Sequence, residues 1–259
     1  MNHKNLTRKS AIITGASRGI GAATATYLAG NGMKVLLAAR SKSQIENIAS
    51  TLRANGYIAE AMACDVSRYS EVENLTRFCK EQFGSLDLLV NNAGVIDPIT
   101  RLSESDPDEW GRIVDINFKG VYHGLRAAIP VMQKQNEGTI INISSGAATG
   151  ALEGWSHYCS TKAAVLSLTR CADKEYREQG VHVVGLSPGT VATDMQVKIK
   201  ESGINPVSNL DFSSHISPED VAQAIGYLAG EGASKHLGTD FSLKTKEGRI
   251  EAGLTPHTV

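Results

Sequence analysis

Long apolar runs, paired cysteines and an excess of one charge are all missing from this 259-residue sequence. No apolar run approaches the roughly 20 residues that a membrane-spanning helix needs. The formal net charge is −1, so the composition favours neither nucleic acid nor an anionic membrane as a binding surface. We therefore expect a small-molecule ligand, with no nucleic acid and no membrane among the partners.

The cysteines are scattered and form no Cys-x-x-Cys pair; they are Cys64, Cys79, Cys159 and Cys171. The histidines are dispersed as well, so no metal-ligand motif occurs and we expect no metal. The first nine residues are polar and lack the apolar core of a signal peptide. Reduced thiols without an export signal are typical of the cytoplasm, which is the location that we expect.

Short apolar or β-branched runs alternate with helical stretches along the chain. The runs predict strands at 10–14, 34–39, 57–63, 86–90, 139–143, 181–186 and 240–243. Helices are predicted at 19–30, 42–55, 69–83, 107–134, 156–179 and 218–229. This alternation predicts an α/β fold, a doubly wound parallel sheet of the Rossmann type with about seven strands and helices on both faces.

No linker, repeat or low-complexity stretch divides the chain, so we expect one domain over residues 1–259. Segment 192–214 lacks strand character and contains the helix breakers Gly203, Pro206 and Asn209. Long irregular segments in compact domains are commonly functional lids or disordered loops. We interpret this one as a mobile lid over a substrate site.

A glycine-rich turn follows the first strand and opens the first helix. Its spacing is Gly-x-x-x-Gly-x-Gly, formed by Gly15, Gly19 and Gly21. Glycines allow backbone N–H groups to approach a pyrophosphate, and the helix N-terminus adds a positive dipole end. No Gly-Lys-Ser/Thr follows, which argues against a P-loop, so the turn predicts a dinucleotide site.

The end of the second strand indicates which dinucleotide binds. An NAD site usually carries an acidic residue about 20 residues beyond the glycines. Here Ala39 holds that place, Arg40 follows it, and Arg18 lies within the glycine turn. Guanidinium groups bind a 2′-phosphate by charge-assisted hydrogen bonds, so we predict NADPH as the cofactor rather than NADH.

Tyr158 and Lys162 stand four residues apart in a predicted helix and therefore share one face. A free tyrosine has a pKa of about 10 and is a poor proton donor or acceptor near neutral pH. A cation about 4 Å away contributes roughly 4 kcal/mol at an effective dielectric of 20, which favours the phenolate. We expect the Lys162 ammonium to lower the pKa of Tyr158 toward the working range of an acid–base catalyst.

With Asn91-Asn-Ala-Gly94 and Pro188-Gly189-Thr-Val191-Ala-Thr193, these motifs make the chain resemble the short-chain dehydrogenase/reductase family, in its short single-domain branch. The resemblance extends from Thr14 to about Val221. It implies a catalytic tetrad of Asn117, Ser145, Tyr158 and Lys162. Ser145 is chosen over Ser144 because the family's usual interval from serine to tyrosine is thirteen residues.

The resemblance also implies the cofactor contacts. These are Gly15, Ser17, Arg18, Gly19, Ile20 and Gly21 in the turn, Arg40 after the second strand, Asp65 and Val66 near the adenine, Asn92, Ala93 and Gly94 along the cofactor, Tyr158 and Lys162 at the nicotinamide ribose, and Pro188, Gly189, Val191 and Thr193 near the carboxamide. Where many relatives carry Asp-Gly-Gly after the last strand, this chain reads Phe241-Ser-Leu-Lys-Thr-Lys-Glu-Gly248.

The function implied is an NADPH-dependent reduction of a carbonyl compound to an alcohol, with Tyr158 as general acid. Ser145 is expected to bind the carbonyl oxygen, and Asn117 to hold a water that passes protons toward Lys162. Two alternatives stay open: a 3-oxoacyl-acyl-carrier-protein reductase, and a catalytically silent NADPH-binding regulator.

Two further expectations concern the substrate and the assembly. An apolar-walled pocket is suggested by Leu152, Trp155 and His157 together with the lid residues Met195, Val197, Ile199 and Ile204. We also expect a homodimer or homotetramer, because the two long helices carry apolar residues on more than one face: Val114, Phe118, Val121, Val165, Leu168 and Cys171.

Overall fold

The computed structural model describes residues 6–256; the ends of the single domain predicted over 1–259, including the first five residues of the polar N-terminal segment, lie outside it. Seven parallel strands form one sheet in the order β3-β2-β1-β4-β5-β6-β7. Their bounds are β1 Ser10–Thr14, β2 Lys34–Ala39, β3 Ala59–Ala63, β4 Leu88–Asn91, β5 Gly138–Ile143, β6 Val181–Ser187 and β7 Asp240–Ser242. The predicted fold class is confirmed.

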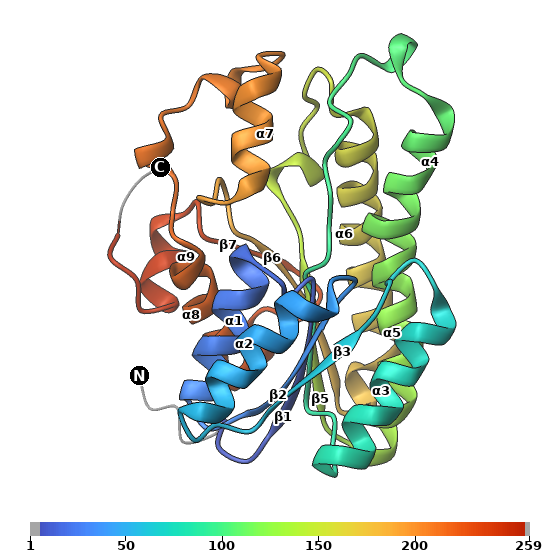
Figure 1. Cartoon of the computed structure of the whole chain (residues 1–259), viewed down its shortest axis with the longest axis vertical. Coiled ribbons are helices and arrows are strands. Elements are labelled where there is room, and N and C mark those ends of the chain that lie inside the picture. The colour runs from blue at the N-terminus through green and yellow to red at the C-terminus, as the bar shows by residue number, and fades with distance from the viewer. Residues whose placement is uncertain (1–5, 257–259) are drawn as a thin grey trace.

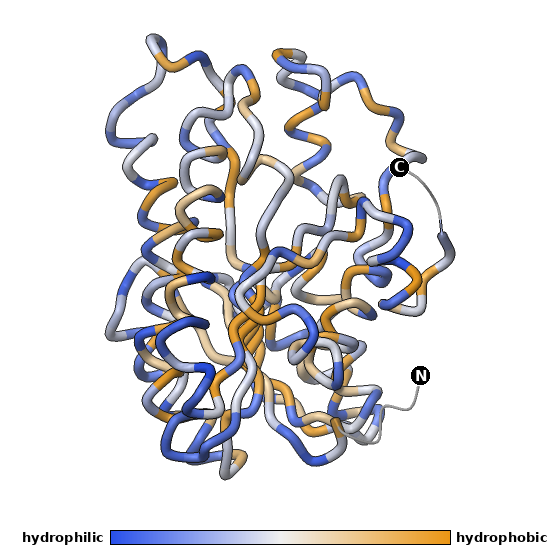
Figure 2. The backbone as a smooth tube through the Cα atoms, turned by 180° about the vertical axis from the view of Figure 1, so that it is seen from behind, coloured by the Kyte–Doolittle hydropathy of each residue, from blue (hydrophilic) through white to orange (hydrophobic). Residues whose placement is uncertain are grey.

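Helices cover both faces of the sheet (Figure 1). On one face lie α1 (Gly19–Gly30), α2 (Lys42–Ala54), α8 (Pro218–Tyr227) and α9 (Lys246–Glu251). The other face carries α3 (Tyr69–Phe83), α4 (Pro107–Val114), α5 (Gly120–Gln135) and α6 (Ser156–Tyr176). The five central strands are buried on both sides, so the apolar residues gather along the middle of the molecule (Figure 2).

Successive strand residues supply two separate cores. In β1, Ile13 packs under α1 and α8, whereas Ile12 packs under α3 and α5. Alternation along a strand requires this division. The carboxyl ends of the strands are left uncovered by these helices and meet along one edge of the sheet, where ligands bind in doubly wound folds.

The predicted helix 107–134 is interrupted. α4 ends at Val114, a π-helical turn spans Asp115–Lys119, and α5 begins at Gly120. The side chain of Asn117 points out of this turn and holds the backbone of Val95 at both polar atoms: the Val95 N–H donates to Oδ1 at 2.9 Å, and Nδ2 donates to the Val95 carbonyl at 2.8 Å. π-bulges of this kind occur frequently at functional sites.

Several other predicted boundaries move by one to three residues, and two of them are instructive. β3 begins at Ala59 rather than at Tyr57, because Tyr57 and Ile58 are exposed beyond the sheet edge. α6 ends at Tyr176, and a 3₁₀ turn, Arg177–Gln179, completes the predicted range before Gly180 at φ +77°. The sequence places both elements correctly and misplaces only their ends.

Segment 192–214 is more regular than its sequence suggested. It contains the helix α7, Asp194–Ser202, followed by 3₁₀ turns at Pro206–Asn209 and Phe212–Ser214. Ile199 of α7 is 1 % exposed, and Asn205 donates from Nδ2 to the Glu153 carbonyl at 3.0 Å. The expectation of an irregular stretch is therefore wrong, because α7 has an apolar residue to bury; that it acts as a mobile lid stays a prediction.

The six apolar residues that suggested an oligomer are mostly used within the monomer. Val121 and Val165 are buried in the core beneath α5 and α6, and Phe118 and Leu168 pack against it. Only Cys171 is exposed. The homo-oligomer thus stays a prediction. These apolar residues support it less than the sequence suggested, because most of them pack within one chain.

Candidate active site

A cavity of about 1160 Å³ runs along the carboxyl edge of the sheet. Its lining begins at Arg40 and Asp65, which follow β2 and β3, and reaches Lys244, which follows β7. β2 and β7 are five strand positions apart in the sheet, which corresponds to roughly 24 Å at about 4.8 Å per step. A cavity of this length has two ends, and the residues at each end differ in chemistry.

The glycine turn forms one wall, and its backbone is tightly packed. A Cβ on Gly15 would lie 2.8 Å from Cα of Ala93, and one on Gly21 would lie 2.4 Å from the carbonyl oxygen of Gly15. Gly15 and Gly19 adopt φ of +64° and +53°, which glycine tolerates best. No side chain in residues 6–256 caps the N-terminus of α1, and its first turn has no acidic residue. The turn therefore fits a phosphate group of a dinucleotide.

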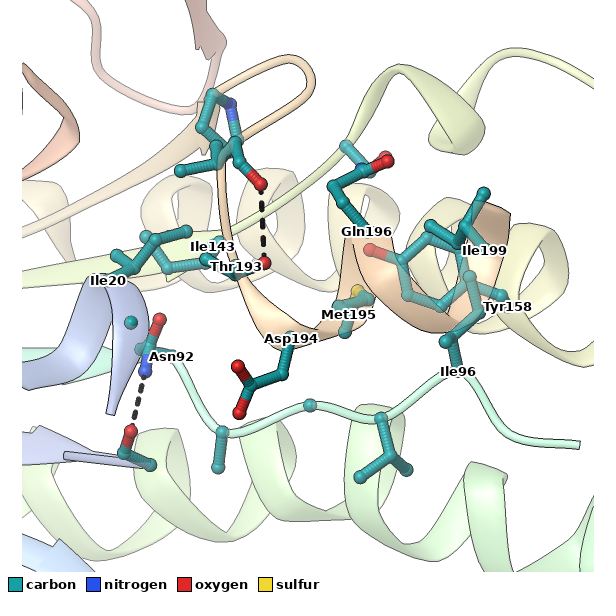
Figure 3. A pocket seen from close by; sticks show the side chains of 18 of the residues that line it. Ile20, Asn92, Ile96, Ile143, Tyr158, Thr193, Asp194, Met195, Gln196 and Ile199 are labelled. Atoms are coloured by element: carbon teal, nitrogen blue, oxygen red, sulfur yellow. Dashed lines mark hydrogen bonds between the residues drawn. The ribbon is translucent and has the colours of Figure 1, made fainter. Parts of the chain in front are cut away.

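Thr14 and Asn92 hold this turn against the neighbouring strand. The Asn92 amide donates to the carbonyls of Thr14 at 2.9 Å and Gly15 at 3.2 Å, and Figure 3 draws one of these two bonds. The Thr14 hydroxyl accepts from the backbone N–H groups of Asn92 and Ala93. The segment expected along the cofactor thus holds both the end of β1 and the start of the glycine turn. All predicted turn residues that line the cavity come from one short stretch: Gly15, Ser17, Arg18, Gly19 and Ile20. Gly21 does not line the cavity; it packs against the carbonyl oxygen of Gly15.

The end beyond β2 contains one exposed cation. Arg40 lines the cavity and makes no ion pair within the described part of the chain, whereas Arg18 pairs with Asp194 at 3.2 Å. Burial opposes ionisation of Asp65, yet hydrogen bonds from Ser67 and the charges of Arg40 and Arg68 lower the pKa of that carboxyl.

Two further residues, Ser41 and Gln44, line this end of the cavity. The sequence analysis missed them because neither belongs to a recognised motif.

Ser145, Tyr158 and Lys162 meet on the opposite wall; the helical spacing predicted this for Tyr158 and Lys162, and the resemblance implied it for Ser145. Tyr158 projects from α6, and its hydroxyl points into the cavity toward α7 (Figure 3). The Lys162 ammonium lies 5.6 Å from the centroid of the Tyr158 ring and donates to the Ile143 carbonyl at 2.6 Å. Ser145 follows β5, and its Oγ accepts from the Ala147 N–H at 3.1 Å.

The pKa of Tyr158 moves in the direction opposite to the sequence expectation. Burial raises it to about 12, with a smaller opposing effect of the Ser145 hydroxyl. Burial likewise lowers the pKa of Lys162 to about 8, against the charge of Asp240. Both side chains are nearly enclosed, and enclosure disfavours each charged form. At neutral pH, Tyr158 is therefore a protonated phenol beside a protonated lysine.

The side chain of Asn117 does not line the cavity, and the expectation that this residue holds a water stays a prediction. Its side chain is occupied by the two hydrogen bonds to Val95 and is absent from the cavity lining, which takes Ile116 from the same turn. The amide therefore positions the loop after β4 rather than facing the site. Val66, Ala93, Gly94, Pro188, Gly189, Val191 and Thr193 do line the cavity, as the resemblance implied.

The structure reveals a half-buried carboxylate, that of Asp240, behind the catalytic residues. Asp240 lies opposite Gly185 in the register of β7 and β6, and a Cβ on Gly185 would come 2.7 Å from its Oδ1. The carboxylate reaches across this gap to β5, where the Ser144 hydroxyl donates to Oδ2 at 3.1 Å. Its Oδ1 is buried without a hydrogen-bond partner among residues 6–256. Burial raises the pKa of Asp240 to about 6, opposed by the Ser144 hydrogen bond and the charges of Lys162 and Arg170.

Ser144 and Ser145 thus face different partners, as alternation along the strand end predicts. The Ser144 hydroxyl contacts Asp240 behind the site, whereas Ser145 interacts with Tyr158. The sequence analysis missed Asp240, because its contact with Ser144 joins β5 and β7, which are not neighbours in the sheet.

The apolar wall near Tyr158 is only partly as predicted. Leu152, Trp155, Met195 and Ile199 line the cavity, and Trp155 packs edge-on against Tyr158 with ring centroids 5.5 Å apart. Val197 instead points to solvent with 45 % exposure. His157 is buried beneath the Pro98 carbonyl, and Ile204 packs over Gly154; neither lines the cavity. Ile96 and Val207 complete the wall, and no sequence signal marked them.

Two observations bear on metals and membranes. Within residues 6–256, no group of three or more His, Cys, Asp and Glu side chains is arranged to hold a metal ion. None of the helices in this part of the chain combines the length and apolar character that crossing a membrane requires.

Comparisons with known proteins agree with this geometry. The chain matches the short chain dehydrogenase family over residues 9–203. It is 35 % identical over 222 residues to an uncharacterized oxidoreductase of Staphylococcus aureus strain MRSA252, which covers 86 % of this chain and 91 % of that protein. It is 36 % identical over 233 residues to a 3-oxoacyl-[acyl-carrier-protein] reductase of a Synechocystis strain, covering 90 % and 93 % of the two chains.

Among solved structures, an NAD⁺-bound xylitol dehydrogenase superposes with a TM-score of 0.86. It is 23 % identical and the match covers 93 % of this chain and 99 % of that chain, so it shows a shared fold. The protein is an oxidoreductase of a family that acts on CH–OH and C=O groups with nicotinamide cofactors. On the family match and the identity to the oxidoreductase of Staphylococcus aureus, the chain belongs to the short-chain dehydrogenase family.

Proposed function

We propose that the protein is an NADPH-dependent carbonyl reductase that converts a small ketone or aldehyde to an alcohol. The observation that carries the proposal is one cavity with Ser145, Tyr158 and Lys162 on one wall and an unpaired Arg40 at the far end. The nicotinamide, when bound, supplies the hydride. Gly15, Gly19 and the N-terminus of α1 would hold the pyrophosphate, and Pro188, Gly189, Val191 and Thr193 would border the carboxamide.

The protein's own groups then supply orientation and a proton. Tyr158 donates the proton from its hydroxyl to the carbonyl oxygen, for which its raised pKa keeps it protonated at neutral pH. Ser145 donates a hydrogen bond to the same oxygen and stabilises its developing charge. The Lys162 ammonium, 5.6 Å from the phenol ring, stabilises the phenolate that remains.

The choice of NADPH rests on the end of β2. Ala39 leaves no carboxylate to accept from a ribose 2′-hydroxyl, and Arg40 presents a guanidinium that forms no direct ion pair among the described residues. A 2′-phosphate would neutralise that charge. Asp65 is the nearest acidic group that the cavity contains beyond β3, and its charge already interacts with Arg40.

A second candidate is the reduction of an acyl-carrier-protein thioester, which the 36 % identity to the Synechocystis reductase supports. The test is steady-state oxidation of NADPH, and separately of NADH, with a panel of ketones, aldehydes, diketones and a 3-oxoacyl thioester. Turnover of the thioester alone would select the second candidate. Tight NADPH binding without turnover of any compound would instead indicate a silent NADPH-binding regulator.

A further inference from the structure

Lys244 occupies the substrate end of the cavity, in the loop between β7 and α9. Its aliphatic stem passes over Gly189, where an added Cβ would lie 3.3 Å from the lysine Cγ. Its ammonium reaches Gly146, the residue after Ser145, where an added Cβ would lie 3.0 Å from Nζ. The positive charge therefore stands beside the segment that carries the catalytic serine.

The base of this side chain is firmly held. Leu243 is fully buried, and its N–H donates to the Ser187 carbonyl at 3.0 Å, which fixes the loop to the end of β6. On the other side, the Thr245 hydroxyl donates to the Ser242 carbonyl and accepts from the Gly248 N–H, both at 3.1 Å. Residue 244 is thus anchored from both sides, and only its side chain is free to adjust.

Among the cations of the cavity, Lys244 differs from Arg18, Lys198 and Lys162 in lacking a partner within the described residues. Arg18 pairs with Asp194, Lys198 pairs with Asp97, and Lys162 donates to the Ile143 carbonyl. Lys244 makes no ion pair and no side-chain hydrogen bond to any residue between 6 and 256. Arg40 is also unpaired, but it lies five strand positions away, at the end proposed for the 2′-phosphate.

Lys244 is solvent-exposed although it lines the cavity, and we take an anion bound beside it to belong to the substrate rather than to the cofactor. The phosphate-binding features, Gly15 to Gly21 and Arg40, lie at β1 and β2, whereas Lys244 follows β7. The carboxamide expected near Gly189 is neutral. The remaining wall around Tyr158 is apolar and consists of Ile96, Leu152, Trp155, Met195, Ile199 and Val207.

We propose that Lys244 binds a carboxylate of the substrate, and that the enzyme reduces an oxo acid whose remaining body is apolar. This inference rests on the proposed reductase activity and adds its substrate class. The ammonium holds the carboxylate beside Ser145, the apolar wall covers the rest of the molecule, and the reacting carbonyl lies between them, facing Tyr158. A neutral ester of the same acid would lose the ion pair and keep the apolar contacts.

The test compares 2-oxo-4-phenylbutanoate with its ethyl ester at saturating NADPH, with 1-phenyl-1,2-propanedione as an uncharged reference. In the wild type, kcat/KM for the acid should exceed that for the ester at least tenfold, because a hydrogen bond to a charged group is worth a factor of roughly 10 to 150. Lys244→Met should lower kcat/KM for the acid at least tenfold, mainly through KM, and for the ester less than threefold. Lys244→Arg should keep most of the preference, and added salt should reduce it.

Lys246→Met is the matched control, since Lys246 is exposed two residues further along and does not line the cavity. It should behave as wild type with both compounds. NADPH affinity, measured by fluorescence titration, should be unchanged in Lys244→Met.

Three outcomes would overturn the inference while leaving the reductase proposal in place. They are turnover of the diketone without preference for the acid over the ester, an equal loss for acid and ester in Lys244→Met, and weakened NADPH binding in that variant. Oxidation of NADPH with none of the carbonyl compounds would overturn the reductase proposal, and the oxo-acid inference with it.

Discussion

The two ends of the cavity are built in different ways. At the phosphate end, residues 15–21 form one continuous turn whose shape is set by backbone packed against backbone. At the substrate end, the lining comes from segments far apart in the chain: Ile96, Trp155, Met195, Val207 and Lys244. A side chain added at Gly15 or Gly21 must move the main chain, whereas a substitution at the second end replaces a single side chain. The first end is thus suited to one constant ligand, and the second can change its ligand at little structural cost.

The largest expected effect comes from Tyr158, which lies between the two ends and can separate them. Tyr158→Phe should lower kcat about 10²- to 10⁴-fold, the usual contribution of general acid–base catalysis. NADPH affinity should change little, because the phenol acts on the substrate oxygen. Tyr122→Phe, at a tyrosine that is 48 % exposed on α5, is the control. More than half of the wild-type rate in Tyr158→Phe would refute the catalytic assignment.

The next effect tests the phosphate end through its charge. Arg40→Ala should weaken NADPH binding roughly 10- to 150-fold, the value of one hydrogen bond to a charged group, and change NADH binding little. Arg77→Ala on α3, remote from the cavity, should alter neither. The measurement is kcat/KM for both cofactors. A wild type that prefers NADH, or equal losses for both cofactors in Arg40→Ala, would contradict the NADPH assignment.

A third substitution tests the backbone of the same end. Gly21→Ala should push against the Gly15 carbonyl, 2.4 Å from the new Cβ, and lower the free energy of unfolding by about 1–3 kcal/mol. Cofactor affinity should fall with it, because the turn has to shift. Gly111→Ala in α4 places its Cβ in open space and should be neutral or stabilising by up to about 1 kcal/mol. Urea denaturation of both variants checks this, and equal stabilities would mean that the turn yields freely.

The smallest effect concerns pH. Lys162 has a pKa of about 8, so reduction should decline above that pH as the ammonium loses its proton. The Asp240 charge raises the pKa of Lys162, and Asp240→Asn should therefore move this alkaline limb to lower pH. We expect a loss of about two- to fivefold in kcat/KM at pH 8.5 and little change at pH 6.5. The control is Glu247→Gln, which removes an exposed carboxylate on α9. If the alkaline limb of the pH profile did not move in Asp240→Asn, the charge of Asp240 would not influence Lys162.

The same carboxyl predicts a stability change with a definite sign. The pKa of Asp240 is raised from 3.8 to about 6 in the folded state. At pH values between these two, the folded protein therefore binds more protons than the unfolded chain. The free energy of unfolding should therefore decrease as pH rises from about 4 to 6, and the wild type should carry this cost at neutral pH. In Asp240→Asn that decrease should be absent.

The limits of sequence-based prediction follow the same division between the two ends. Gly15, Gly19, Tyr158 and Lys162 could be predicted because turns and helices fix the relative positions of residues that are close in sequence. Asp240 and Lys244 could not, because their neighbours lie on strands that only the folded sheet brings together. The direction of the Tyr158 pKa was also beyond reach, since it depends on how fully α7 and Trp155 enclose the phenol. Spacing determines that Tyr158 and Lys162 are neighbours, whereas burial determines their charge.

The gap at Gly185 makes two distant parts of the chain inseparable. Asp240 fits only because position 185 carries no side chain, yet the two residues are 55 positions apart in the sequence. A recombinant that took residues up to 200 from a relative with alanine at this point of β6, and the remainder from this chain, would bring a methyl group against the carboxylate. The final strand is therefore not an exchangeable module, and any crossover between residues 185 and 240 has to preserve this glycine–aspartate pair.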